Sequence, residues 1–320
     1  MLRGVTRREQ ECLICQILPL QAELENGDEV DFECRTEVDG DEYPDMPYQI
    51  NLPDEFVANH RTELESGDAF VCIHGGQAVR NATGDDVIVF PTDGAVQLME
   101  GVEHEAVEGH PAIGFGNRTV LVVRVSGPID SEIPHVSSER LAGAIFGIGN
   151  ESFQNPMSTQ YRRCSFNALN FIPASGFPEI VDGVIDIQLN SSLRAKQATT
   201  VHQDASKEVR KLLGVNSLAD TFDHVMYCLA GGTLFGSGNN RKDSWLAFAL
   251  AYALGTRTEN YSVYNSKSAS CDKLSILMHE IGHNLGFQHS GDAGNSDYGD
   301  TSGTVSCCSS VRSKQLWRTF

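Results

Sequence analysis

Three histidines near the carboxyl-terminal end of the chain have the spacing of a metal site. They lie in the run HEIGHNLGFQH, where His279 and His283 are four residues apart and His289 follows six residues later. On a helix with about 3.6 residues per turn, residues four apart project from the same face and can bind one metal ion. Gly286 can adopt a left-handed conformation at little cost, so the helix can end there and the chain can turn to bring in His289 as third ligand. Three protein ligands leave a fourth tetrahedral position open for water or substrate, which is typical of catalytic zinc sites.

The glutamate beside the first histidine, Glu280, is the candidate general base. Zinc lowers the pKa of a bound water to about 7, so that a neighbouring carboxylate can take its proton. We therefore expect zinc as the cofactor and hydrolysis as the reaction, with Glu280 removing a proton from the attacking water and later delivering it to the leaving amine. For a bare HExxH the alternative is a set of ordinary polar residues on a surface helix. The added glycine and third histidine favour the metal site.

The extended motif is the signature of the metzincin peptidases, and four segments resemble one branch of them, the gametolysin family of algal and protist peptidases. The resemblance implies an α+β, metzincin-like catalytic domain in which a twisted mixed sheet carries two long helices. It also implies a zinc-dependent endopeptidase that hydrolyses internal peptide bonds of extracellular or cell-wall proteins. The segments are HEIGHNLGFQHSGD (279 to 292), YGDTSG (298 to 303), DHVMYC (223 to 228) and STQYRRCSFNALNFIPA (158 to 174).

The sequence departs from the gametolysin pattern after the YGDTSG segment. In that family a methionine in a tight turn below the zinc follows this segment, whereas here the stretch is TVS (304 to 306) and no methionine occurs after Met278. The chain ends at Phe320, where relatives continue into the lower wall of the cleft, so we expect a shortened C-terminal subdomain. The alternative function is a catalytically impaired zinc-binding relative that acts as a non-enzymatic extracellular module. A mis-predicted gene with a longer product would restore the active enzyme.

Negative charge is concentrated in the first third of the chain. Residues 1 to 120 contain 25 acidic residues against 7 arginines and no lysine, whereas the rest contains 18 acidic and 17 basic residues. This asymmetry predicts a boundary near residues 114–118, between a small acidic region over 1–116, which the strand patterns below indicate to be β-rich, and a domain over 117–320. By resemblance, the second part is the metzincin-like zinc peptidase domain, shortened at its C-terminus. The acidic region is either a plain solvated surface or a pro-segment or accessory domain. Because clustered Lys and Arg are missing there, nucleic acid is not expected as a partner. The resemblance implies a protein or peptide substrate instead.

Hydrophobic patterns place the candidate site on a framework of strands and helices. Apolar runs at 69–75 and 86–91 predict strands in the N-terminal region, whose residues 21–48 are acidic enough to suggest incomplete order. No apolar run is long enough to span a membrane. Further along, the patterns predict strands at 118–127, 183–189 and 223–229, helices at 137–148 and 205–214, and an active-site helix at 272–285.

The apolar run WLAFALAYAL (245 to 254) is ambiguous between a buried strand and a helix when judged by periodicity. By resemblance, it is the strand that comes just before the zinc helix in sequence and lines the cleft. A substrate peptide would then add to its free edge as an extra strand, through main-chain hydrogen bonds.

Three further residues have roles that the sequence leaves open. Asp292 either orients a zinc ligand or is a surface acid. Tyr298 either assists the oxyanion or is a structural loop residue. Cys72 is a candidate for capping the zinc in a latent form, although no diagnostic flanking sequence supports that role.

Cysteines and glycosylation sequons bear on the compartment. The chain has nine cysteines, so at least one stays free or pairs between molecules if the others form disulfides. The excess of sequons favours an extracellular, secreted glycoprotein, whereas the first twenty residues make a poor signal peptide. The five sequons begin at Asn81, Asn117, Asn150, Asn190 and Asn260.

Overall fold

The structure is a computed structural model, and it divides the chain into two compact units. The first unit contains Met1–Leu18 and Phe32–Glu105, and the second contains Pro19–Asp31 and Ala106–Phe320. The predicted division into 1–116 and 117–320 stays a prediction. The described residues are 12–24, 27–36, 47–65, 69–81, 86–91, 95–99, 115–149, 153, 155–236, 242–250, 259–268 and 270–287.

The first unit is rich in strands and is held by two disulfides. The first residues of β1 (Cys12–Leu24) pair antiparallel with β4 (Phe70–His74), and the bonds Cys12–Cys72 and Cys15–Cys34 fasten β1 to neighbouring segments. The predicted strands at 69–75 and 86–91 are present, and strands also cover 21–24 and 27–35, where the acidic composition suggests incomplete order. The strand β2 (Gly27–Arg35), like β1, is divided between the two units. The other elements of the first unit are β3 (Tyr48–Ile50), α1 (Asp54–Glu65), β5 (Gln77–Arg80), β6 (Asp86–Val89) and β7 (Val96–Met99).

The second unit is a mixed α+β fold around one mixed sheet, as expected. Its strands are arranged in the order β10-β8-β11-β13-β12, with β9 also paired to β8. The pairs among β8, β9, β10, β11 and β13 are parallel, whereas β12 is antiparallel to β13. Parallel strands that are covered on both faces have continuous apolar sequences, and VLVV in β8 is an example. The strands are β8 (Gly116–Ser126), β9 (Leu169–Pro173), β10 (Val184–Gln188), β11 (His224–Leu229), β12 (Trp245–Leu250) and β13 (Tyr261–Asn265).

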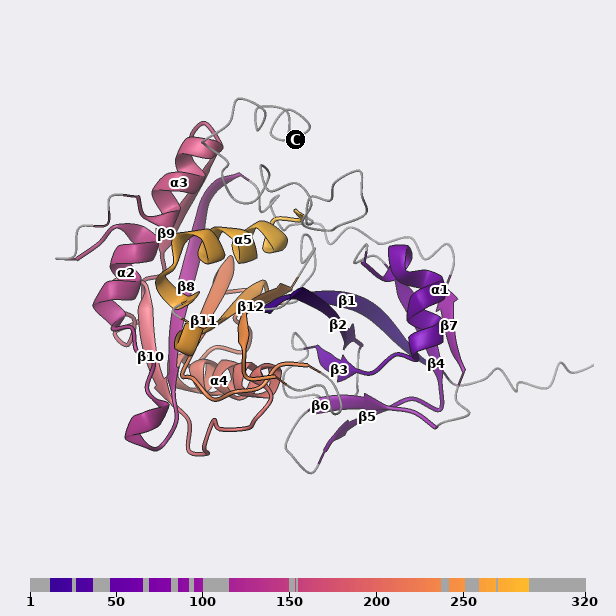
Figure 1. Cartoon of the computed structure of the whole chain (residues 1–320). Helices are drawn as coiled ribbons and strands as arrows, with labels where there is room; N and C mark the ends of the chain where they lie inside the picture. Colours follow the sequence, from indigo (N-terminus) through magenta and orange to yellow (C-terminus); the bar gives the residue numbers. More distant parts are fainter. Residues whose placement is uncertain are drawn as a thin grey trace, which may run out of the picture. The chain divides into compact units, whose positions relative to one another are not determined.

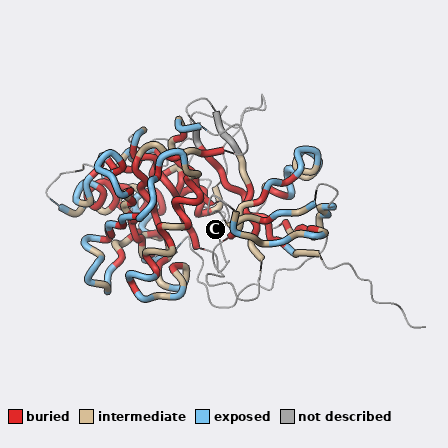
Figure 2. The backbone as a smooth tube through the Cα atoms, turned by 90° about the horizontal axis from the view of Figure 1, so that it is seen from below, coloured by how far each residue is buried: buried red, intermediate tan, exposed pale blue. Residues whose placement is uncertain are grey.

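Helices cover both faces of this sheet (Figure 1). Because side chains alternate along a strand, Met226 and Cys228 pack in the core beneath α2, α3 and α5, whereas Tyr227 between them faces α4, where it contacts His202. Figure 2 shows that the buried residues form the interior of each unit. The helices are α2 (Ser138–Phe146), α3 (Met157–Cys164), α4 (Ala198–Leu213) and α5 (Leu274–Asn284), with short 3-10 turns η1 (Asp130–Glu132), η2 (Ser266–Ser268) and η3 (Ser270–Asp272).

Local sequence signals account for several helix ends. Ser137 accepts a hydrogen bond from the backbone N–H of Arg140 and so caps α2, the helix predicted at 137–148. Gly214 ends α4 in the left-handed conformation at φ 68°, at the end of the predicted range 205–214, although α4 begins at Ala198 rather than at 205. Among the described residues, no helix has both the length and the apolar character that crossing a membrane requires.

The expectation for residues 245–254 needs two corrections. The run is a strand, β12, over its described residues, but β13 rather than β12 comes directly before the active-site helix. In addition, the outer edge of β12 is not free, because residues 20–24 of β1 pair with it. Sequence patterns missed β13 because YSVYN includes Ser262 and Asn265, which are buried through hydrogen bonds: Ser262 Oγ accepts from Tyr264 Oη, and Asn265 Nδ2 donates to Trp245 O.

Candidate active site

The predicted active-site helix is α5, and it ends where the glycine was expected to end it. Gly286 has φ 84°, in the left-handed region. Its N–H donates to the carbonyl of His283 at 2.9 Å, and the N–H of Phe287 donates to the carbonyl of Gly282 at 2.9 Å. These two bonds form a Schellman motif, which satisfies carbonyls that the helix leaves without partners. The turn predicted at Gly286 is therefore confirmed.

The structure brings the first two predicted ligands together. The Nε2 atoms of His279 and His283 lie 2.9 Å apart, and the two rings are nearly perpendicular at 87°. The other ring nitrogen of His283, Nδ1, lies 2.9 Å from the carbonyl oxygen of Phe287. A carbonyl can only accept, so Nδ1 carries the proton and Nε2 of the neutral ring has the lone pair. The backbone of the Schellman turn thus selects the tautomer that a metal requires at Nε2.

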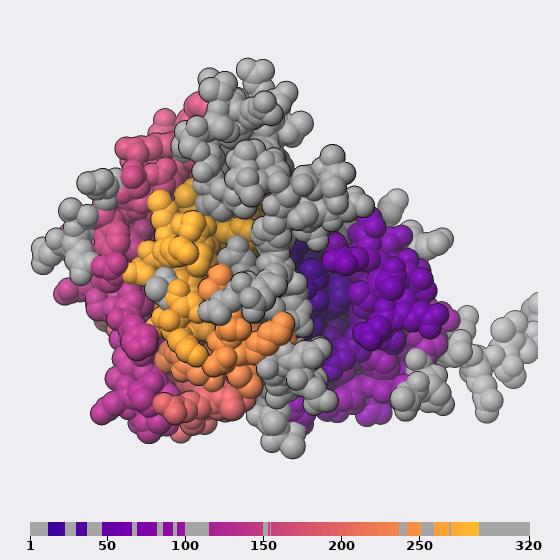
Figure 3. Space-filling model, in the orientation of Figure 1, coloured from indigo at the N-terminus to yellow at the C-terminus, as the bar shows by residue number. Residues whose placement is uncertain are grey.

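The donor set fits a zinc ion. Two imidazole nitrogens bound to one tetrahedral zinc at about 2.0–2.1 Å would lie about 3.3 Å apart. The observed Nε2 separation of 2.9 Å is within a few tenths of an ångström of that value, so a small rotation of either ring would suffice. Part of the segment that contains α5, drawn in yellow, is visible at the surface in Figure 3.

The structure describes the candidate base but not the other predicted site residues after α5. Glu280 is fully buried on α5, whereas its neighbour His279 is only partly buried. His289, Asp292 and Tyr298 lie outside the described residues, so their assigned roles stay predictions. Within the described part of the chain, no three His, Cys, Asp or Glu side chains gather as a metal-binding group.

Two buried side chains that the sequence patterns did not single out hold α5 in place. Asn284 is fully buried, and its Nδ2 donates to the carbonyls of Leu250 in β12 and Tyr261 in β13, both at 2.8 Å. Tyr161 Oη of α3 donates to the carbonyl of Met278 at 2.6 Å. Asn284 directly follows His283 in the sequence. Its role could have been inferred from the sequence, because it is a polar residue on the apolar side of a helix.

A further polar pair lies buried near the start of β11. Asn260 Nδ2 donates to the carbonyl of Asp223 at 3.2 Å and lies 2.8 Å from Nδ1 of His224. Burial lowers the pKa of His224 to about 4, and the nearby Arg118 adds to this effect while Asp223 opposes it, so the ring stays neutral. Because Asn260 is only 5 % exposed, its sequon is not available in the folded chain, whereas Asn117 and Asn190 are exposed.

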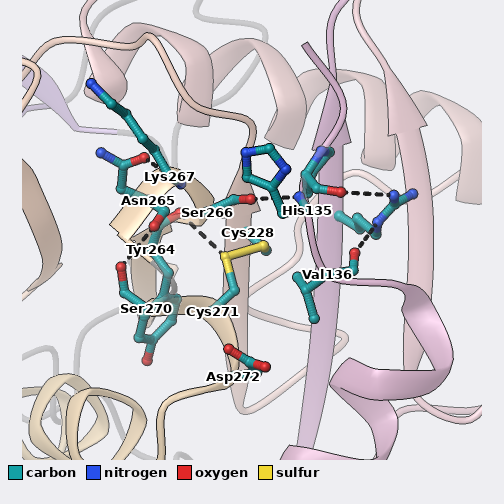
Figure 4. Close-up of a disulfide and its surroundings, with 12 residues drawn as sticks. His135, Val136, Cys228, Tyr264, Asn265, Ser266, Lys267, Ser270, Cys271 and Asp272 are labelled. Carbon is teal, nitrogen blue, oxygen red and sulfur yellow. Dashed lines mark hydrogen bonds between the residues drawn. A yellow bond between two sulfur atoms is a disulfide. The ribbon is translucent and has the colours of Figure 1, made fainter. Parts of the chain in front are cut away.

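The segment before α5 is fastened by a disulfide between Cys228 of β11 and Cys271 of η3 (Figure 4). Beside it, Ser270 Oγ lies 2.7 Å from the carbonyl oxygens of both Leu246 and Asn265. The start of the histidine-bearing helix is therefore tied to the strands β11, β12 and β13, in the same way that Asn284 ties its end.

The disulfides also decide the role proposed for Cys72. Its sulfur is bonded to Cys12, so it offers no thiolate, and the hypothesis that it caps the zinc is wrong for this state of the chain. Cys12 and Cys15 bond to different partners, so their CxxC spacing does not form a disulfide of its own. Cys164 is disulfide-bonded as well.

Comparison with known proteins defines the class. The family model of gametolysin peptidase M11 matches residues 133–314, which include α5 and all three candidate histidines. This match covers more than half of the chain, so the chain belongs to the gametolysin peptidase family. It is accordingly a peptidase, a hydrolase of peptide bonds, and the predicted family resemblance is confirmed. No curated protein matches the chain significantly.

Proposed function

We propose that this chain is a zinc-dependent endopeptidase with a metzincin-like catalytic domain. The observation that carries the proposal is the facing pair of Nε2 atoms of His279 and His283, 2.9 Å apart, with the tautomer of His283 held by the carbonyl of Phe287. Membership of the gametolysin peptidase family supports the same reaction. The sheet order, with one antiparallel strand beside β13, supports the metzincin-like arrangement.

In the proposed mechanism, His279, His283 and His289 hold the zinc. The metal, when bound, supplies Lewis-acid polarisation of the scissile carbonyl and lowers the pKa of a water molecule. Glu280 accepts a proton from the attacking water and delivers it to the leaving amine. Asn284 keeps the helix against β12 and β13, so that the histidines stay in register with the strand that would bind the peptide.

We further propose that the substrates are extracellular or cell-wall proteins and that the chain is secreted. Disulfides persist mainly in oxidising compartments, and those at Cys12–Cys72, Cys15–Cys34 and Cys228–Cys271 support secretion. The exposed sequon asparagines Asn117 and Asn190 support it as well.

The second candidate function is a zinc-binding relative without catalysis. The observation in its favour is the stretch TVS (304 to 306), which contains no methionine at the place where the resemblance implies the turn below the metal. Metal binding would survive this change because the methionine is not a ligand. Such a protein would contain stoichiometric zinc and cleave no peptide.

The deciding experiment compares Glu280→Gln with the wild-type chain. We measure zinc by elemental analysis and the cleavage of fluorescent casein with and without a chelator. Loss of a general base costs about 10²–10⁴-fold in rate, so we expect at least that loss with zinc retained. Glu139→Gln, on the exposed part of α2, is the matched control and should cleave normally. Unchanged cleavage by Glu280→Gln would contradict the role of the base, and wild-type zinc without cleavage would favour the non-catalytic relative.

A further inference from the structure

The outer edge of β12 is covered by a segment from far away in the sequence. Residues 20–24 of β1 run antiparallel to β12, with Leu20 opposite Leu250, Ala22 opposite Phe248 and Leu24 opposite Trp245. Residues 20–24 of β1 and the whole of β12 belong to the second unit. Without this segment, β12 would be the last strand of the order β10-β8-β11-β13-β12.

An edge strand of this kind is a binding surface for an extended peptide. Its unpaired N–H and C=O groups accept another strand through main-chain hydrogen bonds, while side-chain pockets provide selectivity. The covering segment is docked as such a peptide would be, because Leu20, Gln21 and Ala22 are 1 %, 7 % and 0 % exposed.

The covered part of β12 is the part next to the candidate site. Leu20 lies opposite Leu250, and the carbonyl of Leu250 accepts the hydrogen bond from Asn284. Asn284 directly follows His283 along α5. A peptide that reached the histidines along β12 would therefore need the place that Leu20 and its neighbours occupy.

We propose that residues 20–24 are an internal ligand of the peptide-binding edge of β12 and compete with substrate for it. This inference rests on the proposed function, since it assigns the edge to substrate. Because residues 20–24 belong to the same chain as β12, their docking is intramolecular and does not depend on protein concentration, so a micromolar substrate of equal intrinsic affinity would rarely displace them. The full chain is then largely latent, and weakening the contact between β1 and β12 activates it.

The test weakens this contact in the full chain. Ala22→Asp places a carboxylate at a fully buried position opposite Phe248, which disfavours docking of the segment. Ile14→Asp is the matched control, because Ile14 is 49 % exposed and lies in the part of β1 that pairs with β4. We expect casein cleavage per bound zinc to rise at least tenfold in Ala22→Asp and to stay unchanged in Ile14→Asp. Equal or lower cleavage by a folded Ala22→Asp protein would overturn the proposal.

A milder variant covers the case in which Ala22→Asp does not fold. Leu20→Ala removes apolar contact from the same segment without adding a charge, and a competing segment predicts a smaller activation in the same direction. If residues 20–24 served only to stabilise the fold, activity would instead decrease in proportion to the folded fraction.

A binding measurement separates failure of this inference from failure of the proposed function. The probe is a fluorescein-labelled peptide LPLQAEL, which has the sequence of residues 18–24, and its scrambled form is the control. In proteins that carry Glu280→Gln, we expect the probe to bind at least tenfold more tightly when Ala22→Asp is also present. Tighter binding with no cleavage by any variant would uphold the internal ligand and refute the peptidase. If the variants with and without Ala22→Asp cleaved casein at equal rates and bound the probe equally, the peptidase would be upheld and the internal ligand refuted.

Discussion

The two faces of the sheet in the second unit both bury ionisable groups, but they differ in the kinds of group that they bring together. On the α4 face, the carboxylate of Glu259 lies 3.3 Å from Arg210, 3.6 Å from His202 and 2.7 Å from the hydroxyl of Ser206, and Tyr227 also donates to it. On the α5 face, two imidazoles point their Nε2 atoms at one another with no carboxylate between them. The first arrangement neutralises its charges internally, whereas the second concentrates donor atoms for a cation.

The pKa of Glu259 reflects this neutralisation. Burial alone would raise it, but the hydrogen bond and charge of His202, the charge of Arg210 and the hydrogen bond from Tyr227 together lower it to about 2. Burial and the neighbouring Glu259 raise the pKa of Tyr227 well above its ordinary value. The α4 cluster therefore keeps fixed charges at physiological pH, and the comparison teaches that it stabilises the fold, while the α5 face carries the residues proposed for the chemistry.

The largest expected effect is on the α5 face. His283→Ala removes one of the two facing nitrogens, so we expect zinc content to fall below stoichiometric and casein cleavage to fall by at least about 10²-fold. The unfolding midpoint of the metal-free protein should also fall, because His283 is buried and its Nδ1 bonds to the carbonyl of Phe287, so zinc content and cleavage are compared per folded molecule. His135→Ala, at an exposed position, is the control for zinc content and cleavage. Full zinc and full activity in His283→Ala would mean that this face is not the metal site.

The next largest expected effect is on the α4 face, where a substitution should lower the stability of the fold rather than the activity. Glu259→Ala leaves Arg210 buried without its carboxylate, and breaking a buried ion pair from one side costs about 3–5 kcal/mol. Urea unfolding measures this loss, with the exposed Glu208→Ala on α4 as a control that should change stability by less than about 0.5 kcal/mol. Cleavage per folded molecule should stay normal, and a selective loss of activity would break the division of roles between the faces.

Much of the framework was predictable because its signals are local. The serine cap of α2, the glycine ends of α4 and α5, and the continuous apolar strand β8 each follow from residue types within one turn or one strand. The spacing of His279 and His283 is local too, since one helix carries both side chains. The position of His289 remains a prediction.

The remainder depends on contacts between residues that are distant in sequence. Glu259 meets His202 and Tyr227 only after three elements have assembled, so no local pattern indicates the α4 cluster. The pairing of β1 with β12 joins residues more than 200 positions apart. Strand β13 escaped detection because tertiary hydrogen bonds, rather than an apolar pattern, allow its polar residues to be buried.

Acid should affect the two faces in different pH ranges. The fold lowers the pKa of His224 from 6.5 to about 4. Its contribution to the free energy of unfolding is therefore complete above pH 6.5 and is lost as the pH falls towards 4, a change of about 3 kcal/mol. Glu259 has its pKa lowered from 4.5 to about 2, so its contribution is lost only below pH 4.5. Urea unfolding of the metal-free protein at pH 7 and pH 4.5 measures the first change. His224→Gln should remove most of it, and an unchanged pH dependence in that variant would contradict the assignment.

The smallest expected effects come from removing one hydroxyl on each face. Tyr161→Phe removes the bond to the carbonyl of Met278, a neutral acceptor, and should cost about 1 kcal/mol. Tyr227→Phe removes the bond to the ionised Glu259, and bonds to charged groups contribute about 1.5–3 kcal/mol. Both rings stay in place, so urea unfolding compares the two bonds directly. Of these two tyrosines, only Tyr161 contacts the helix that carries the histidines. A change in zinc affinity should therefore occur in Tyr161→Phe alone. We expect this change to be less than tenfold, because Asn284 and the other anchors of α5 remain in place. Equal stability losses in the two variants would show that Glu259 is less strongly charged in the folded chain than its partners imply.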